Sequence, residues 1–590
     1  MESRKQQALN VRIAAAKLAY DRPHAEQQAN GEEFSYRFDG TDPERGSKSS
    51  HIANYTKGLP HNEVDGLICN SDDYQLFVKG IDSGDSRDFQ ATPLGPKGST
   101  SDAPIEWKSA YSQSHGVNVR AWESAGAGLA FDLEGPDAQA VAMPPAPTIG
   151  SDELTAEVAE VYEMALLRDI PFTEFDTNPE VAASVARLNQ LKWFKNDSLS
   201  DISDAAAERR RGQITPQTAF RGTAFGDATG PYISQFLTRG TPEIGFSNNN
   251  VLDGRVAYGA ITLRNRVRVA TPHKDYMTSW EWWLDVQNGA DLRGTESYVN
   301  QGGDRYRFIT TPRDLATYVH HDALYQAYLN ACLALLSMRV PFDPGLPFQA
   351  ADHLDHQQAF AHFGGPHILS LVTEVATRAL KAVRYQKFNV HRRLRPEAIA
   401  GRLHQWRNTQ SPNLAPVADL SVEINDTLQV VKAHNKAQND EYKSSIGGAE
   451  FDRDDVYLLP MAFAEGSPMH PSYGAGHATV AGACVTILKA FFDHGYVLPD
   501  PYVVPTADGK KLEAIHNQGM SLTVEGELNK LASNISIGRD WAGVHYFTDY
   551  YESARMGEEI ALGILEEQKL TFGENFSMTV PLFSGGTKRI

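Results

Sequence analysis

The sequence has few cysteines and no long apolar run. Its 590 residues include three cysteines, Cys69, Cys332 and Cys484, so a disulfide framework cannot organise the fold, although one pair remains possible. Cys484 lies in an apolar helical stretch and is expected to be a buried thiol. No apolar segment approaches the roughly 20 residues that span a bilayer. The charged N-terminus also lacks the apolar core of a signal peptide, which favours a cytoplasmic chain or a mature secreted or cell-wall form.

Basic residues are in the minority. Lys and Arg number 55 against 74 Asp and Glu, a formal net charge of −19, so nucleic acids and anionic membranes are poor partners. The length allows one large elaborated domain or two to three smaller ones. A local cluster of basic residues is more informative in such an acidic chain, because it has to form against the overall negative charge.

Apolar residues at helical spacing dominate the chain after residue 150. They predict helices over 152–168, 178–193, 201–211, 229–238, 312–338, 366–384, 416–436, 476–493, 523–535 and 545–568. A further helix is predicted at the N-terminus, over 5–20. Residues 21–148 are rich in Gly, Asp, Ser and Pro and predict an irregular wrap with short strand-like pieces such as 74–78. Residues 255–275 predict a strand or hairpin. We therefore expect a mainly α protein, with an N-terminal helix and wrap in 1–150 and a helical domain in 151–590.

The first basic cluster lies in residues 384–396. Six basic side chains fall within these thirteen positions: Arg384, Lys387, His391, Arg392, Arg393 and Arg395. Pro396 disfavours helical geometry at Arg395, so a helix should end before it and run into an extended segment. Arg392 and Arg393 are expected on the solvated surface. Lys387 and Arg395 are candidate oxyanion ligands.

A glycine-rich loop over residues 466–477 leads into an apolar helix. The free N–H groups and the positive dipole end of a helix N-terminus make such a junction an anion site. His470 and His477 flank the loop. The spacing alone is weak evidence, but two histidines beside free N–H groups favour oxyanion chemistry.

A third stretch, residues 536–549, carries Arg539, Gly543 and His545. One straight helix would not place the arginine and the histidine on a common face. A turn at Gly543, with His545 opening the next helix, would let both side chains converge on one small ligand.

Together the three stretches resemble the signature shared by vanadium-dependent haloperoxidases and one group of acid phosphatases. The shared elements are Lys387 with Arg395-Pro396, Gly476-His477, and Arg539 with Gly543 and His545. Chain length and the wider sequences 386–396 and 467–473 resemble the bromoperoxidases of red algae and their cyanobacterial relatives. The resemblance implies a helical bundle of the haloperoxidase and acid phosphatase type, with a few short strands.

The resemblance also implies a role for each signature residue. His545 would hold vanadium through an imidazole nitrogen, and His477 would be the acid–base residue. Arg384 and His470 match positions linked to halide binding and selectivity. The vanadate oxygens would be bound by four groups: Lys387, Arg395, Arg539 and the N–H of Gly476.

Ala475 departs from the family pattern. The family places a serine before the Gly-His pair, and its hydroxyl donates to a vanadate oxygen. A hydrogen bond to a charged group contributes about 1.5–3 kcal/mol. Because three cationic side chains remain, we expect weakened or retuned cofactor binding rather than loss.

The implied activity is that of a bromoperoxidase. Hydrogen peroxide would oxidise bromide or iodide, and chloride poorly, to hypohalous acid that halogenates small organic acceptors. Vanadate would act as a Lewis acid, and Lys387 would polarise the bound peroxide. Red algal relatives form dodecamers, which implies a large homo-oligomer.

Residues 348–357 offer a possible second metal site. Oxygen ligands at staggered spacing follow a loop rich in proline and glycine, a pattern compatible with a hard cation such as calcium. The resemblance implies a structural calcium site here, and the alternative is a solvated acidic loop. The candidate ligands are Phe348, Ala350, Asp352, Asp355 and Gln357.

Two other functions fit parts of the sequence. An acid phosphatase would use the same pocket, with His545 as nucleophile and His477 as the acid for the leaving group. A non-catalytic helical assembly protein would use the basic cluster only to pair with acidic neighbours. Bromination, phosphatase and vanadate-binding assays distinguish the three.

Overall fold

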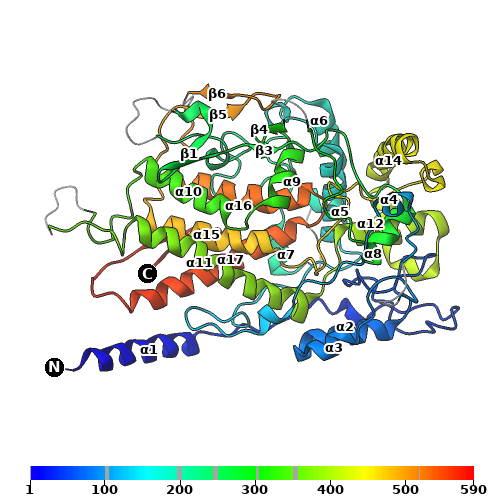
Figure 1. Ribbon diagram of the computed structural model, residues 1–590, viewed down its shortest axis with the longest axis horizontal. Coiled ribbons are helices and arrows are strands. Elements are labelled where there is room, and N and C mark those ends of the chain that lie inside the picture. The colour runs from blue at the N-terminus through cyan, green and yellow to red at the C-terminus, as the bar shows by residue number, and fades with distance from the viewer. Residues whose placement is uncertain are drawn as a thin grey trace.

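A computed structural model describes residues 2–99, 105–195, 199, 202–242, 250–300, 305–349, 356–516 and 519–590. Within these residues the fold is mainly helical, as predicted (Figure 1). The α-helices are α1 (Arg4–Asp21), α2 (Ser71–Ser83), α3 (Ser86–Gln90), α4 (Ala110–His115), α5 (Asp152–Leu166), α6 (Pro179–Leu188), α7 (Asp204–Arg209), α8 (Trp280–Gln287), α9 (Pro312–His321), α10 (Gln326–Ser337), α11 (Gly365–Tyr385), α12 (Pro396–Thr409), α13 (Ala418–Glu423), α14 (Asn425–Ile446), α15 (Gly476–Phe491), α16 (Val524–Trp541) and α17 (Phe547–Lys569).

Shorter elements connect these helices. The 3-10 helices are η1 (Glu32–Phe34), η2 (Gly126–Leu129), η3 (Phe172–Glu174), η4 (Lys192–Phe194), η5 (Gln235–Leu237), η6 (Asn250–Asp253), η9 (Pro412–Val417) and η10 (Ala449–Asp452), and η8 (Gln386–His391) is a π-helix. The strands of the described residues form four antiparallel pairs: β1 (Arg255–Tyr258) with β2 (Ile261–Arg264), β3 (Val267–Arg268) with β4 (Tyr306–Arg307), β5 (Tyr502–Pro505) with β6 (Leu512–Ile515), and β7 (Thr579–Pro581) with β8 (Thr587–Arg589).

Helix α15 lies in the middle of the bundle, in contact with α11, α16 and α17 (Figure 1). Every residue from Ala478 to Phe491 is buried, as expected of a helix that is apolar on all sides. Two glycines let α15 and α17 approach closely. A Cβ at Gly482 would lie 1.9 Å from the carbonyl oxygen of Ala554, and one at Gly557 would lie 2.0 Å from that of Thr479. The N-terminus of α15 is thereby held beside the start of α17.

Several predicted elements differ from the structure. Residues 74–78 lie in α2 rather than in a strand, because their apolar side chains Tyr74 and Phe77 are three apart and share one buried face. Helix α1 forms as predicted, but it buries none of its residues. Residues 229–238 contain only η5.

The predicted helix over 312–338 is two helices. The chain leaves α9 at Asp322, which has extended backbone angles, and resumes helical structure in α10. The sequence offers no proline or glycine at this break. The carboxylate of Asp322 bonds to a histidine on α15, a tertiary contact that local patterns do not report.

Arg392 and Arg393 are not on the surface, and the prediction for them is wrong. Both are buried. Arg392 pairs with Glu33, with 2.7 Å between Nε and Oε1, and Arg393 pairs with Glu157 at 2.8 Å and Asp549 at 2.9 Å. These acidic partners come from distant segments, so the local sequence did not reveal them.

Two exclusions from the sequence agree with the structure. All three cysteines are unpaired, and the Cys484 thiol is buried in α15, as predicted. Among the described residues, no helix combines the length and apolar character needed to cross a bilayer. The division of the chain at residue 150 stays a prediction.

Candidate active site

A cavity of about 390 Å³ opens where the ends of several helices meet. The three predicted stretches contribute to its wall, although they lie far apart in the sequence. The predicted site residues in the wall are Arg384, Lys387, His470, Gly476, His477, Arg539 and His545. Arg395 and Ala475 lie behind this surface, where both are buried.

His545 sits between a turn and a helix start. Gly543 has φ of +86°, a conformation that favours glycine, and Tyr546 caps α17. The predicted turn at Gly543 is therefore confirmed. It reverses the chain after Arg539, in the last turn of α16, so that His545 faces the same cavity.

Asp549 fixes the orientation of the His545 ring. Its Oδ2 lies 2.6 Å from Nδ1 of His545, so Nδ1 carries the proton and Nε2 is the nitrogen with the lone pair. Burial, strengthened by Arg395, lowers the pKa of His545 well below its ordinary value. Burial alone would raise the pKa of Asp549, but Arg393 and the hydrogen bond from His545 outweigh it and hold that pKa low. A neutral imidazole with an oriented Nε2 is the form that ligates a metal.

Arg395 contacts His545 from behind the cavity surface. Its Nη1 donates to Nε2 of His545 at 2.9 Å and to the carbonyl oxygen of Val544 at 2.8 Å. Its Nε donates to the carbonyl oxygen of His470 at 3.0 Å. Burial lowers the pKa of Arg395 to about 10, so the guanidinium stays charged at neutral pH. Arg395 has to release Nε2 before that nitrogen can ligate a metal.

Lys387 is a buried amine held by carbonyl groups. Its Nζ donates to the carbonyl oxygens of Pro471 at 2.9 Å and Ser472 at 3.0 Å. Burial, together with Arg395 and Arg384, lowers the pKa of Lys387 well below its ordinary value. An anion in the cavity would reverse part of this shift, because it favours the protonated amine.

Two further groups have donors to offer an anion. Arg539 donates through Nη1 to the carbonyl oxygen of Val319 at 2.8 Å, and its buried Nε has no hydrogen-bond partner. Gly476 opens α15, where the helix leaves its first N–H groups unpaired. Unpaired buried donors and unbalanced positive charge fit an oxyanion such as vanadate.

Carboxylates hold the remaining predicted side chains. Nε2 of His477 lies 3.0 Å from Oδ1 of Asp322. Arg384 donates to Glu123, whose Oε2 also lies 3.6 Å from Nε2 of His470. Burial, reinforced by Lys387 and Arg395, lowers the pKa of His470 well below its ordinary value.

Ala475 is the N-cap residue of α15. Its side chain makes no capping bond, and its own N–H donates to the hydroxyl of Ser553 at 2.8 Å. The Ser553 hydroxyl accepts from the backbone of Ala475, so it does not replace the hydroxyl that the family pattern places at position 475. The missing donor noted in the sequence is therefore also missing in the structure.

The structure describes two of the five calcium candidates. Ala350, Asp352 and Asp355 lie outside the described residues. Phe348 is described, with φ of +63°, and Gln357 is described as well. The site stays a prediction.

Sequence reasoning missed the residues that orient the site. Asp549 carried a usable signal, because it lies four positions after His545 at a helix start and therefore shares its face. Asp322 and Glu123 carried none, since each reaches the cavity through the tertiary fold.

The fold and site define a helical bundle whose helix ends surround a pocket lined by basic side chains and histidines. A family model described as the VCPO second helical-bundle domain matches residues 429–572. The chain is 50% identical to a vanadium-dependent bromoperoxidase of Corallina pilulifera over 100% of this chain and 99% of that protein. It is 49% identical to one of Corallina officinalis over the same shares, 100% and 99%.

A solved structure agrees with these sequence comparisons. The homohexameric second vanadate-dependent bromoperoxidase of Ascophyllum nodosum matches with a TM-score of 0.80 and 28% identity, over 100% of this chain and 90% of that one. The chain belongs to the vanadium-dependent bromoperoxidase family.

Proposed function

We propose that this protein uses vanadate to oxidise bromide with hydrogen peroxide, giving hypobromous acid that halogenates small organic acceptors. One observation carries the proposal beyond family membership. Among the described residues, Lys387, Arg395 and Arg539 are buried basic side chains that donate to carbonyl oxygens and have no carboxylate within ion-pair distance. A buried charge without a partner is strongly destabilising, so an anion is the natural partner of this cluster.

The residues divide into holding and reacting groups. His545 would ligate vanadium through Nε2, with its ring oriented by Asp549. Vanadate oxygens would be held by Lys387, Arg395, Arg539 and the N–H of Gly476. When bound, vanadate supplies Lewis-acid activation of hydrogen peroxide.

His477 handles the proton. The overall reaction joins hydrogen peroxide, bromide and one proton to give hypobromous acid and water. His477, held through Nε2 by Asp322, takes a proton from the incoming peroxide and returns one to the leaving water. Lys387 places positive charge beside the oxygen that bromide attacks. Arg384 and His470 would bind the halide, with iodide accepted and chloride disfavoured.

The test is a pair of assays on one preparation. Monobromodimedone bromination is measured with peroxide, bromide and vanadate, beside hydrolysis of p-nitrophenyl phosphate. Bromination that requires vanadate and bromide supports the proposal. Phosphatase turnover without bromination contradicts it.

We also propose a large homo-oligomer and a structural calcium ion. The Ascophyllum relative is described as homohexameric, and the resemblance to red algal enzymes favours a dodecamer. Light scattering coupled to size-exclusion chromatography measures the number of chains.

The proposed calcium ion is tested by chelation, which should lower Tm, and added Ca²⁺ should restore it. An unchanged Tm would contradict the calcium site in 348–357.

A further inference from the structure

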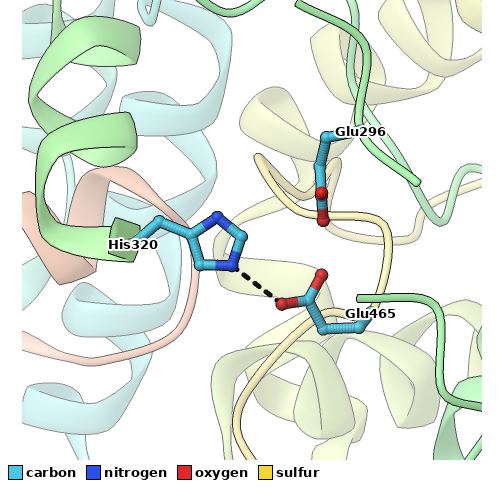
Figure 2. A group of neighbouring side chains, drawn as sticks. All are labelled: Glu296, His320 and Glu465. Atoms are coloured by element: carbon cyan, nitrogen blue, oxygen red, sulfur yellow. Dashed lines mark hydrogen bonds and ion pairs between the residues drawn. The ribbon is translucent and has the colours of Figure 1, made fainter. Parts of the chain in front are cut away.

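Three side chains that the bromide reaction does not use meet beside the cavity. Glu296 lies in the loop between α8 and α9, His320 in the last turn of α9, and Glu465 in the loop before α15. One ligand atom from each lies within 4.8 Å of the other two. Figure 2 shows the carboxyl groups and the imidazole pointing toward one another. His320 and Glu465 also line the cavity.

The oxygens of this cluster are short of partners. Glu465 accepts one contact, with 2.8 Å between its Oε1 and Nε2 of His320. Its other oxygen, Oε2, is buried without a hydrogen-bond partner, and the side chain is only 5% exposed. Both carboxyl oxygens of Glu296 are likewise buried, and no N–H or hydroxyl group of the described residues donates to them. Buried carboxylates normally have hydrogen bonds or cations as partners.

The backbone and ring around the cluster are fixed before any ligand arrives. The His320 ring stacks on Phe463 with 3.7 Å between ring centroids. The N–H of Ser297, next to Glu296, donates to the hydroxyl of Tyr276 at 2.7 Å. Lys57 donates to the carbonyl oxygen of Glu465 at 2.9 Å. A site that needs little ordering on binding loses little affinity to conformational entropy.

We propose that Glu296, His320 and Glu465 bind one divalent transition-metal cation, with Zn²⁺ as the reference ion, in the wall of the cavity. Imidazole nitrogen and carboxylate oxygen are both donors that Zn²⁺ accepts, and three protein ligands leave its fourth position open to water. Two carboxylates also balance the charge of a dication. The inference does not depend on the proposed bromide chemistry.

The protonation of the free cluster agrees with this assignment. Burial lowers the pKa of His320 to about 4, so its ring is neutral and able to ligate at neutral pH. Burial and the neighbouring Glu465 raise the pKa of Glu296 to about 8. The competitor for a metal is therefore a proton shared by the two carboxyl groups.

The test measures Zn²⁺ binding to the full chain. Protein freed of transition metals is titrated with Zn²⁺ by calorimetry in buffer containing excess Ca²⁺, which occupies sites made only of oxygen ligands. Wild type should bind one equivalent more than Glu465→Gln or Glu296→Gln, or bind that equivalent at least about tenfold more tightly. X-ray absorption spectroscopy at the zinc edge should show that the bound Zn²⁺ has nitrogen and oxygen ligands.

A matched control separates this site from ordinary His–Glu pairs. His362 and Glu574 have the same 2.8 Å contact between Nε2 and Oε1, but their side chains are 41% and 30% exposed. Among the described residues, they belong to no three-ligand cluster. Glu574→Gln should leave the extra equivalent in place. Circular dichroism confirms that each variant folds.

Either of two results would overturn the proposal. One is a wild type that binds no more Zn²⁺ than Glu465→Gln, which would leave the cluster as a carboxyl pair sharing a proton. The other is a Glu574→Gln variant that loses the same equivalent. If Glu465→Gln misfolds, the less buried Glu296→Gln provides the comparison.

Discussion

Two walls of one cavity treat charge in opposite ways. The oxyanion wall, defined by Lys387, Gly476, Arg539 and His545, bonds mainly to carbonyl oxygens and leaves a buried Arg539 N–H unpartnered. The acidic wall, defined by Glu123, Asp322 and Glu465, pairs each carboxylate with a basic side chain.

The difference shows where a ligand is needed. Hydrogen bonds to basic side chains satisfy part of the acidic wall within the protein, and its remaining unpartnered oxygens point to a small cation. Carbonyl dipoles only partly balance the oxyanion wall, so its positive charge is available to an anion. In an acidic protein with a net charge of −19, Lys387 and Arg539 are buried and make no ion pair among the described residues, although carboxylates line the same cavity.

Removing the proposed nitrogen ligand should have the largest effect. His545→Ala takes away the only imidazole of the oxyanion wall, and we expect bromination to fall by at least about a thousandfold. The measurement is the initial rate with saturating vanadate, together with the ⁵¹V signal of the bound anion. His516→Ala is the control, since His516 makes a similar contact to Asp500 at 2.8 Å on the surface. Equal losses in both variants would contradict the role of His545.

Disturbing the carboxylate behind that ligand should have a smaller effect. Asp549→Asn keeps an oxygen for Arg393 but can place an N–H opposite Nδ1 of His545, which moves the imidazole proton to Nε2. Vanadate affinity should fall about 10–100-fold. Equilibrium dialysis measures it, with Asp500→Asn as the control. An unchanged Kd would mean that Asp549 does not set the tautomer.

Adding a donor to the oxyanion wall should strengthen it. Ala475→Ser places a hydroxyl at the N-cap of α15, where it can accept from the helix and donate to a vanadate oxygen. A donor to a charged group contributes about 1.5–3 kcal/mol, so Kd for vanadate should fall about tenfold or more. Ala475→Cys, of similar size with a weak donor, is the control. The idea fails if both variants bind vanadate alike.

Changing the halide side should have the smallest effect. Arg384 is partly exposed and pairs with Glu123, so Arg384→Phe should shift the ratio of chloride to bromide rates by about fivefold, on the scale of 1 kcal/mol. Parallel assays with each halide measure it. Lys381→Phe, one turn earlier on α11 and paired with Asp132, should leave the ratio unchanged. An unchanged ratio in Arg384→Phe would refute a halide role.

The sequence predicts features that depend on local chemistry. The mainly helical fold, the turn at Gly543 and the extended Arg395 before Pro396 follow from spacing and backbone preference. The prediction that the three basic stretches meet at one site depended on the family resemblance. Partners set by the tertiary fold escaped prediction, as shown by the burial of Arg392 and Arg393 and by the break at Asp322.

The π-helical segment η8 limits where insertions and deletions can occur in this sequence. Lys387 lies within η8, and both it and Arg395 donate to carbonyl oxygens of the same loop, residues 470–472. One residue more or fewer between them would shift the following chain by up to about 3.3–3.6 Å, so only one of the two could still reach that loop. Insertions and deletions should therefore be excluded from 388–394, even where single substitutions are accepted.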